Sequence, residues 1–189
     1  MMNILMTEKM MWLALSLYWV VSAFRVKRTV RKQSGWKRIA YILCLLFAFG
    51  LLFSDYFNST YLNQPVFPQT EFWKIAGLIV CAIGIFFALL ARIWLGSNWS
   101  GRITLKENHE LVQSGPYRIS RNPIYSGFLF AFIGCSMSLG QLKGYLGIIL
   151  LAACLLIKIS QEETFMSQAF GDQWRSYKKR VRRLIPGIY

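Results

Sequence analysis

Long apolar runs separated by short polar segments dominate this chain. Residues 75–91 and 122–142 contain no charged residue, and each run approaches the ~20 residues that a helix needs to cross the hydrocarbon of a bilayer. Three further apolar runs, at residues 10–24, 39–54 and 144–157, are shorter. The first lies near the N-terminus but has no evident signal-peptide cleavage site, so we interpret it as a retained helix. The pattern predicts an all-α integral membrane protein of about five transmembrane helices.

Basic residues alternate between the connections of these runs. Residues 25–38 hold seven Lys and Arg, whereas residues 55–71 hold none. The third connection and the C-terminal tail are again basic, while the fourth contains only Lys143. By the positive-inside rule, the N-terminus is predicted outside and the C-terminus in the cytosol. An even number of spans would break this alternation, so the charges independently favour five.

The formal net charge of +14 does not indicate a nucleic-acid-binding protein, because the basic residues flank apolar spans. The lipid bilayer itself is the expected partner. Residues 170–183, with Trp174 and Tyr177 among Lys and Arg, are interpreted as an interfacial helix on an anionic leaflet. The oligomeric state is not predictable.

The four cysteines lie singly in different apolar runs, and the chain has one histidine. We therefore expect neither a zinc site nor a disulfide framework. The chain is predicted to be one structural domain, with three spans in residues 1–94 and a cofactor-binding region in residues 95–189. Gly140 and Gly144 frame a tight helical hairpin, either as turn residues or as small residues at a helix contact.

Two polar clusters mark the candidate chemistry. The first is the connection at residues 95–123, where Gly115 and Tyr117 flank a turn, Asn122 is a plausible N-cap and Pro123 suits a first helical turn. The second is Lys158 with Glu162, four residues apart at the end of the fifth run. A snorkelling lysine paired with a glutamate is an equally good interpretation of that pair.

Because the fourth and fifth runs form a hairpin, the start of one and the end of the other should meet at the same membrane surface. The first cluster offers turn backbone and aromatic rings, and the second offers carboxylates. Together they suit a polar, cationic cofactor with hydroxyl groups, held beside the bilayer.

A series of short motifs in the second half of the chain resembles the isoprenylcysteine carboxyl methyltransferase family. In order they are Leu95-Gly96, Asn98-Trp99-Ser100, His109-Glu110-Leu111-Val112, Ser114-Gly115-Pro116-Tyr117, Arg121-Asn122-Pro123-Ile124-Tyr125, Gly127, Glu162-Glu163, Phe170-Gly171, Tyr177-Lys178, Arg180-Val181 and Ile185-Pro186. This family is an integral membrane group with a helical fold, and its C-terminal half is similar to that of phospholipid methyltransferases.

The resemblance implies methyl transfer from S-adenosylmethionine to a lipidic acceptor, most simply the carboxylate of a C-terminal prenylcysteine. It implies a cofactor site formed by His109, Glu110, Leu111, Val112, Gly115, Tyr117, Asn122, Pro123, Ile124, Tyr125 and Glu162. Lys158 matches the position of a substrate-orienting arginine, and Lys158 or Arg121 is expected to orient the carboxylate.

Two positions depart from the family pattern. Asn122 stands where the family has histidine, and its amide can still donate and accept hydrogen bonds. Lys158 provides a point charge in place of the bidentate guanidinium of arginine.

Other functions are compatible with the sequence. A phospholipid amine such as phosphatidylethanolamine is an alternative acceptor, but it must lose a proton before it attacks, and His109 or Glu163 would then serve as the base. A sterol-type membrane reductase using NADPH and a non-catalytic lipid-binding protein are further alternatives.

Overall fold

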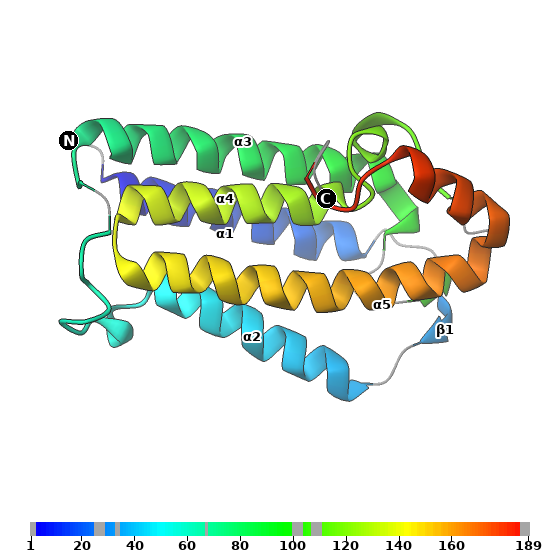
Figure 1. Ribbon diagram of the computed structural model, residues 1–189, viewed down its shortest axis with the longest axis horizontal. Coiled ribbons are helices and arrows are strands. Elements are labelled where there is room, and N and C mark those ends of the chain that lie inside the picture. Colours follow the sequence, from blue (N-terminus) through cyan, green and yellow to red (C-terminus); the bar gives the residue numbers. More distant parts are fainter. Residues whose placement is uncertain are drawn as a thin grey trace.

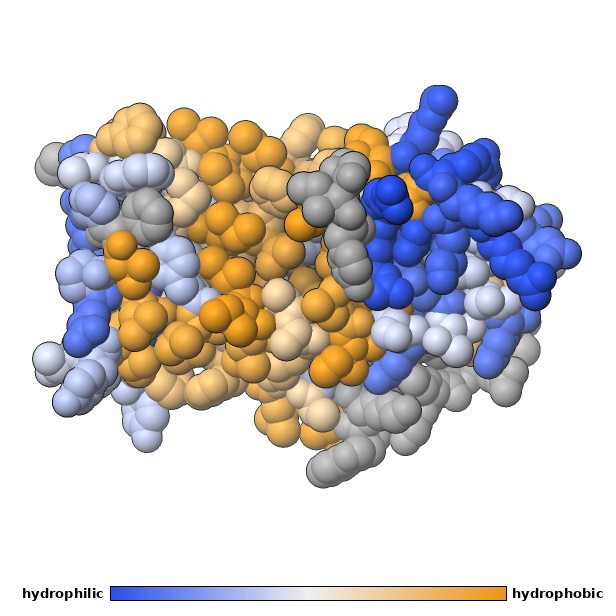
Figure 2. All heavy atoms as spheres, viewed as in Figure 1, coloured by the Kyte–Doolittle hydropathy of each residue, from blue (hydrophilic) through white to orange (hydrophobic). Residues whose placement is uncertain are grey.

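Five helices run back and forth along one axis of the computed structural model, which describes residues 3–24, 29–32, 35–66, 68–99, 104–106 and 111–185 (Figure 1). They are α1 (Ile4–Ala23), α2 (Gly35–Phe53), α3 (Glu71–Leu95), α4 (Pro123–Leu139) and α5 (Leu142–Arg180). By length and composition α1, α3 and α5 can each cross a membrane, while α2 and α4 carry shorter apolar stretches. On the face shown in Figure 2 an apolar band separates two polar ends. The predicted all-α membrane fold is confirmed.

The connections sort into two ends of this bundle. Strand β1 (Thr29–Lys32) in the α1–α2 connection pairs antiparallel with β2 (Thr104–Lys106) in the α3–α4 connection, a small ribbon that the sequence did not predict. At the opposite end, Val66 N donates to Gly140 O and Leu142 N donates to Gln64 O, which joins the other two connections. The two basic connections therefore lie together, as the charge pattern predicts. We call the end of the bundle with the β1–β2 ribbon the site end, and the end with the α2–α3 and α4–α5 connections the hairpin end.

Helices α3 and α4 pack through glycines at very short range. A Cβ atom built on Gly84 would lie 2.4 Å from the backbone nitrogen of Ala131, and one on Gly134 would lie 2.3 Å from that of Cys81. Gly77 and Gly127 meet the facing helix in the same way. Small residues facing one another let two helix backbones approach closely and gain dispersion contacts. These contacts matter in a bilayer, because the hydrophobic effect does not drive helices together there.

Both interpretations of the hairpin glycines apply, one to each residue. Gly140 ends α4 in the left-handed region, at φ 64°, which a glycine adopts without strain. Gly144 instead lies against Ser136, whose hydroxyl donates to Gly144 O at 2.9 Å. The tight α4–α5 hairpin forms as the sequence predicts.

Helix α5 is longer than its apolar run. It continues past residue 157 to Gly171, where φ 49° and ψ −118° break the helical path and redirect the last turns. Trp174 and Tyr177 in these turns are buried against Leu111, Met166 and Phe170, whereas the neighbouring Lys and Arg side chains are exposed. The aromatic residues expected in the headgroup layer thus belong to the protein interior.

Cys44 of α2 and Cys154 of α5 form a disulfide, with 6.8 Å between their Cα atoms. The expectation that no disulfide forms is therefore wrong. The two residues are 110 positions apart, and only the packing of α2 on α5 brings them together. Cys81 and Cys135 remain as free thiols.

The α3–α4 contact predicts that Gly84→Ala strongly destabilises the protein. The new side chain would enter the backbone of α4, and such overpacking costs about 1–3 kcal/mol or more. Thermal unfolding in detergent measures this loss. Gly147→Ala is the matched control, because its Cβ would lie at an ordinary 3.4 Å or more from its neighbours. Equal stability of the two variants would contradict a close α3–α4 contact.

Candidate functional site

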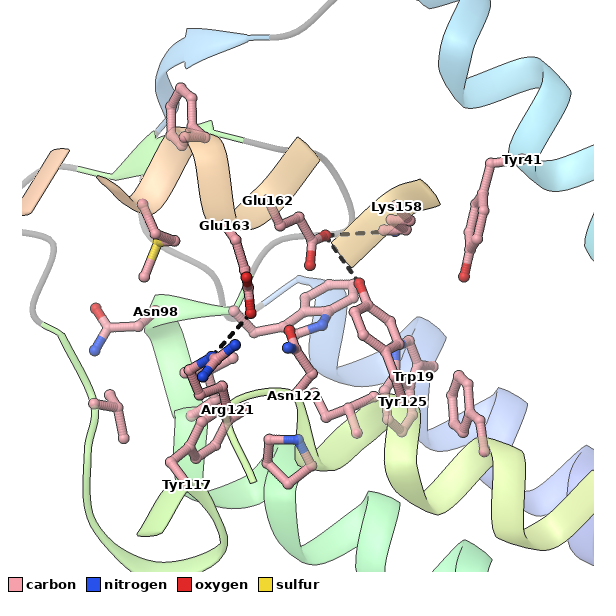
Figure 3. Close-up of a pocket in the computed structure, with 18 of the residues that line it drawn as sticks. Trp19, Tyr41, Asn98, Tyr117, Arg121, Asn122, Tyr125, Lys158, Glu162 and Glu163 are labelled. Carbon is pink, nitrogen blue, oxygen red and sulfur yellow. Dashed lines mark hydrogen bonds and ion pairs between the residues drawn. The ribbon is translucent and has the colours of Figure 1, made fainter. Parts of the chain in front are cut away.

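A cavity of about 510 Å³ extends from the site end into the bundle. Residues from all five helices line it, together with the connection before α4 (Figure 3). The cavity wall becomes less polar with depth. The lining residues from the α3–α4 connection and from α5 are largely polar or aromatic, whereas those from α1 and α2 are largely apolar. This volume lies within the range of roughly 300–1,000 Å³ typical of ligand pockets.

Glu162 is the centre of the polar part of the cavity. Its Oε1 accepts a hydrogen bond from the hydroxyl of Tyr125 at 2.9 Å and lies 3.8 Å from Lys158 Nζ (Figure 3). The same ammonium lies 4.2 Å from the ring centroid of Tyr41 on α2 and 5.6 Å from that of Tyr125. Helices α2, α4 and α5 thus converge on one cation and one carboxylate, and Tyr41 is a contributor that the sequence did not reveal.

Glu163, the next residue, has a different role. Arg121 Nε donates to its Oε1 and Arg183 Nη2 to its Oε2, both at 2.9 Å. The side chains of Arg121 and Glu163 are only 8% and 6% exposed. A further amino group of Arg121 donates to the carbonyls of Lys178 and Val181. These contacts make Glu163 the anchor of two arginines, so it is poorly placed to accept a proton from a substrate.

The segment after α5 folds back over the start of α4. Arg121 N donates to Arg182 O, and the Ser126 hydroxyl donates to Leu184 O at 2.6 Å. Asn122 occupies the N-cap position, but its side chain donates to Arg183 O at 3.0 Å and makes no capping bond. The predicted positions of Asn122 at the N-cap and Pro123 in the first turn are confirmed, but the C-terminal segment, and not the helix end, binds the Asn122 amide group.

Hydrogen bonds and a cation–π contact from neighbouring residues fix the aromatic side chains of the cavity wall. Tyr177 donates its hydroxyl to Tyr117 O at 2.6 Å, which fixes the turn η3 (Gly115–Arg118). Burial raises the pKa of the Tyr117 phenol well above its ordinary value, so that the group stays neutral. The guanidinium of Arg92 stacks 4.3 Å from the Trp99 ring and donates to Ser22 O.

One polar atom of the wall is unsatisfied. The indole nitrogen of Trp174 is buried and finds no hydrogen-bond partner among the residues that the structure describes. Because Trp174 lines the cavity, a bound molecule with an acceptor oxygen could use this donor.

The structure brings together most of the predicted site residues. Those that line the cavity are Leu111, Val112, Tyr117, Arg121, Asn122, Pro123, Ile124, Tyr125, Lys158 and Glu162. Gly115 lies outside it, at φ 57° and packed against the Trp94 ring. His109 and Glu110 fall outside the described residues. The sequence missed Trp19 and Tyr41, which belong to apolar stretches with no distinguishing pattern, and it placed Trp99 in a family motif without assigning it to the site.

Comparisons with known proteins agree with this geometry. A family model described as phospholipid methyltransferase matches residues 72–173, more than half of the chain. The chain belongs to this family. It is also 29% identical over 178 residues, covering 90% of the chain and 88% of the relative, to a probable protein-S-isoprenylcysteine O-methyltransferase of Oryza sativa subsp. indica. Protein-S-isoprenylcysteine O-methyltransferase B of Arabidopsis thaliana is 30% identical over 62% of each chain.

A solved structure shares the fold. It is that of a eukaryotic intramembrane Ras methyltransferase, an isoprenylcysteine carboxyl methyltransferase, with a TM-score of 0.59 and 23% identity over 84% of this chain. The chain spans only 55% of the length of that protein. The predicted family relationship is confirmed, and it favours a methyltransferase over the reductase alternative.

The ion cluster around Glu163 predicts that Glu163→Gln destabilises the site end. The buried guanidinium of Arg121 and the partly buried one of Arg183 would lose their counter-charge, and removing one partner of a buried pair costs about 3–5 kcal/mol. The midpoint of thermal unfolding should fall markedly. Asp172→Asn is the control, because its ion pair with Arg175 is exposed, at 91% and 74% for the two side chains. A Glu163→Gln protein as stable as this control would contradict the anchoring role.

Proposed function

We propose that the protein transfers the methyl group of S-adenosylmethionine to the carboxylate of a prenylated cysteine held at the cytosolic leaflet. The observation that carries the proposal is a single cavity with a polar, charged end and an apolar end. A prenylcysteine has the same division, with a carboxylate at one end and a hydrocarbon chain at the other. The names of the relatives support this choice of acceptor.

The residues of the polar end fit the cofactor. Glu162 offers a carboxylate to an ammonium or to ribose hydroxyls, and the unsatisfied indole nitrogen of Trp174 offers a donor to the cofactor's own carboxylate. Tyr117 and Val112 supply aromatic and apolar surface for the adenine ring. When bound there, S-adenosylmethionine supplies an electrophilic methyl group on a sulfonium.

Lys158 is the residue best placed to orient an acceptor carboxylate. Its ammonium lies at the boundary of the polar and apolar parts, beside Tyr41 and Glu162. Arg121 directs its hydrogen bonds to Glu163 and to backbone carbonyls. We therefore assign the orienting role to Lys158 and a positioning role to Arg121.

The wall favours an acceptor that is already ionised. A carboxylate near neutral pH attacks without losing a proton, whereas an ammonium must first be deprotonated. Among the described acidic residues of the cavity, Glu163 is held by two arginines and Glu162 by Lys158 and Tyr125. The chain's contribution is then to align the carboxylate and to exclude water.

The apolar end suits the lipid chain. Helix α1 contributes Trp12 and Leu15 and α2 contributes Ile42 and Leu45, and Ile42 is itself 40% exposed. We assign the prenyl chain to this part of the cavity, and its entry from the bilayer to the side between α1 and α2.

Acceptor specificity provides the first test. Detergent-solubilised protein with methyl-labelled S-adenosylmethionine should methylate N-acetyl-S-farnesylcysteine. The carboxamide of the same compound keeps the lipid chain but lacks the nucleophile, and it should take up no label. Label in phosphatidylethanolamine vesicles but not in the farnesylcysteine would overturn the proposal in favour of the amine.

Substitutions at Lys158 and Glu162 separate the acceptor from the cofactor. Lys158→Met should lower kcat/KM for the farnesylcysteine by roughly 10–100-fold, the range expected for one lost hydrogen bond to a charged group, while Lys158→Arg retains most of the activity. Glu162→Gln should instead weaken S-adenosylmethionine binding, measured by titration calorimetry. An unchanged cofactor affinity in Glu162→Gln would refute that assignment.

A further inference from the structure

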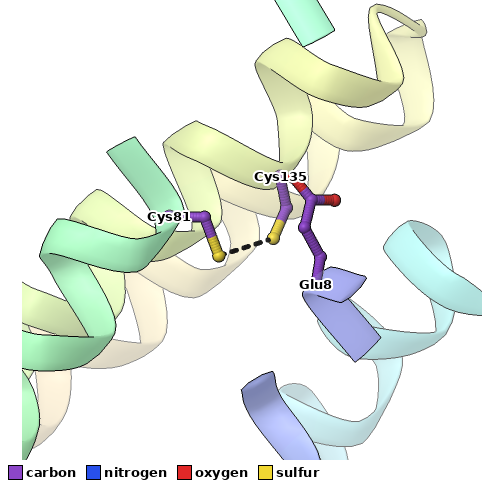
Figure 4. A group of neighbouring side chains, drawn as sticks. All are labelled: Glu8, Cys81 and Cys135. Atoms are coloured by element: carbon purple, nitrogen blue, oxygen red, sulfur yellow. Dashed lines mark hydrogen bonds between the residues drawn. The ribbon is translucent and has the colours of Figure 1, made fainter. Parts of the chain in front are cut away.

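A second cluster of reactive side chains lies in the bundle interior, on three helices. Glu8 of α1, Cys81 of α3 and Cys135 of α4 are buried, and one carboxylate oxygen and the two sulfur atoms lie within 4.8 Å of one another (Figure 4). Its three residues do not line the cavity described above.

Glu8 is the unusual member of this cluster. Its side chain is fully buried, and neither carboxylate oxygen has a hydrogen-bond partner among the residues that the structure describes. A carboxylate in such a setting is costly unless a cation or a proton accompanies it. The carboxylate lies beside Cys135, and the Cys135 thiol lies between it and Cys81 (Figure 4).

The spacing of the sulfur atoms suits one metal ion. Cys81 Sγ and Cys135 Sγ are 3.4 Å apart, and two thiolates bound tetrahedrally at ~2.3 Å from zinc are about 3.8 Å apart. Trp12 lies one helical turn from Glu8 and donates its indole N–H to Cys135 Sγ at 3.4 Å. Donors of this kind orient a thiolate ligand and stabilise its negative charge.

The cluster also has a route from the hairpin end. A cavity of about 300 Å³ opens there and is lined by Glu8, Glu71, Lys74 and Ser138, among others. An ion can thus reach Glu8 without passing through the candidate catalytic cavity. Lys74 provides a positive charge in the same cavity, and it is paired with Glu71 at 3.3 Å.

We infer that Glu8, Cys81 and Cys135 form a binding site for a thiophilic divalent cation, with Zn²⁺ as the ion that fits the ligands. Binding replaces two thiol protons, and the proton that accompanies the Glu8 carboxyl without the cation, with two Zn–S bonds and one Zn–O bond, and these protons leave to solvent. A water molecule or the Ser138 hydroxyl completes the tetrahedron. Two thiolates, one carboxylate and Zn²⁺ carry a net charge of −1, which Lys74 partly offsets.

Metal counting tests the site directly. The full chain, purified in detergent with reductant, is loaded with Zn²⁺, desalted and analysed by mass spectrometry of the metal. We expect one zinc per chain, and at least a tenfold loss of bound zinc in each of Glu8→Gln, Cys81→Ser and Cys135→Ser. Glu71→Gln is the matched control, because it changes a carboxylate of the same cavity outside the cluster and should keep the zinc.

The absorption spectrum of the unmodified protein loaded with Co²⁺ identifies the ligands of the ion. This test does not depend on the folding of any variant. Thiolate-to-cobalt charge transfer and intense visible bands are expected, as for a tetrahedral site. Wild-type protein with neither zinc nor this spectrum would overturn the inference, and so would full zinc retention in Glu8→Gln. A Cys81–Cys135 disulfide in the purified protein would also overturn it.

Discussion

The ion cluster in which Arg121 and Arg183 both bind Glu163 joins three segments that are distant in sequence. Arg121 precedes α4, Glu163 lies on α5, and Arg183 follows the break at Gly171. With these charges paired, the C-terminal segment lies along the start of α4, where its carbonyls accept hydrogen bonds from Arg121 N and from the side chains of Asn122 and Ser126. A buried carboxylate with two guanidinium partners has one stable arrangement, so the cluster fixes how these segments meet. The cluster thereby positions two neighbours of the polar cavity wall, Asn122 next to Arg121 and Glu162 next to Glu163.

The bilayer explains why the cavity has two ends. Polar groups can be placed at the membrane surface at little cost, whereas deep in hydrocarbon only apolar walls are inexpensive. A cavity that begins at the surface and continues between helices therefore becomes apolar with depth. Lys158 lies at the transition, and its contacts with Glu162 and the Tyr41 ring satisfy a charge that would otherwise be costly there. The same division matches a substrate with a charged head and a lipid tail.

Much of the fold was predictable because membrane helices and their charge pattern depend on local sequence. That the start of α4 meets the end of α5, where Tyr125 binds Glu162, also followed from hairpin geometry. The disulfide of Cys44 with Cys154 and the contact of Lys158 with Tyr41 did not, because both depend on how α2 packs on α5, and no local pattern encodes that packing. The hydrogen bond that the Asn122 side chain donates to Arg183 O was not predictable for the same reason, because the two residues are sixty-one positions apart. Aromatic residues near the C-terminus look alike whether they face headgroups or a protein core.

One face of α1 connects the two ends of the molecule. Glu8, Trp12, Leu15 and Trp19 recur at helical spacing, so they form one stripe along the helix. The first belongs to the thiol cluster, and the other three line the candidate catalytic cavity. Trp12 takes part in both, because its indole nitrogen binds Cys135 while its ring packs on Phe49 and Phe132. An ion that tied Glu8 to α3 and α4 would therefore also fix the depth and rotation of α1, and with them the shape of the apolar wall that receives the lipid chain.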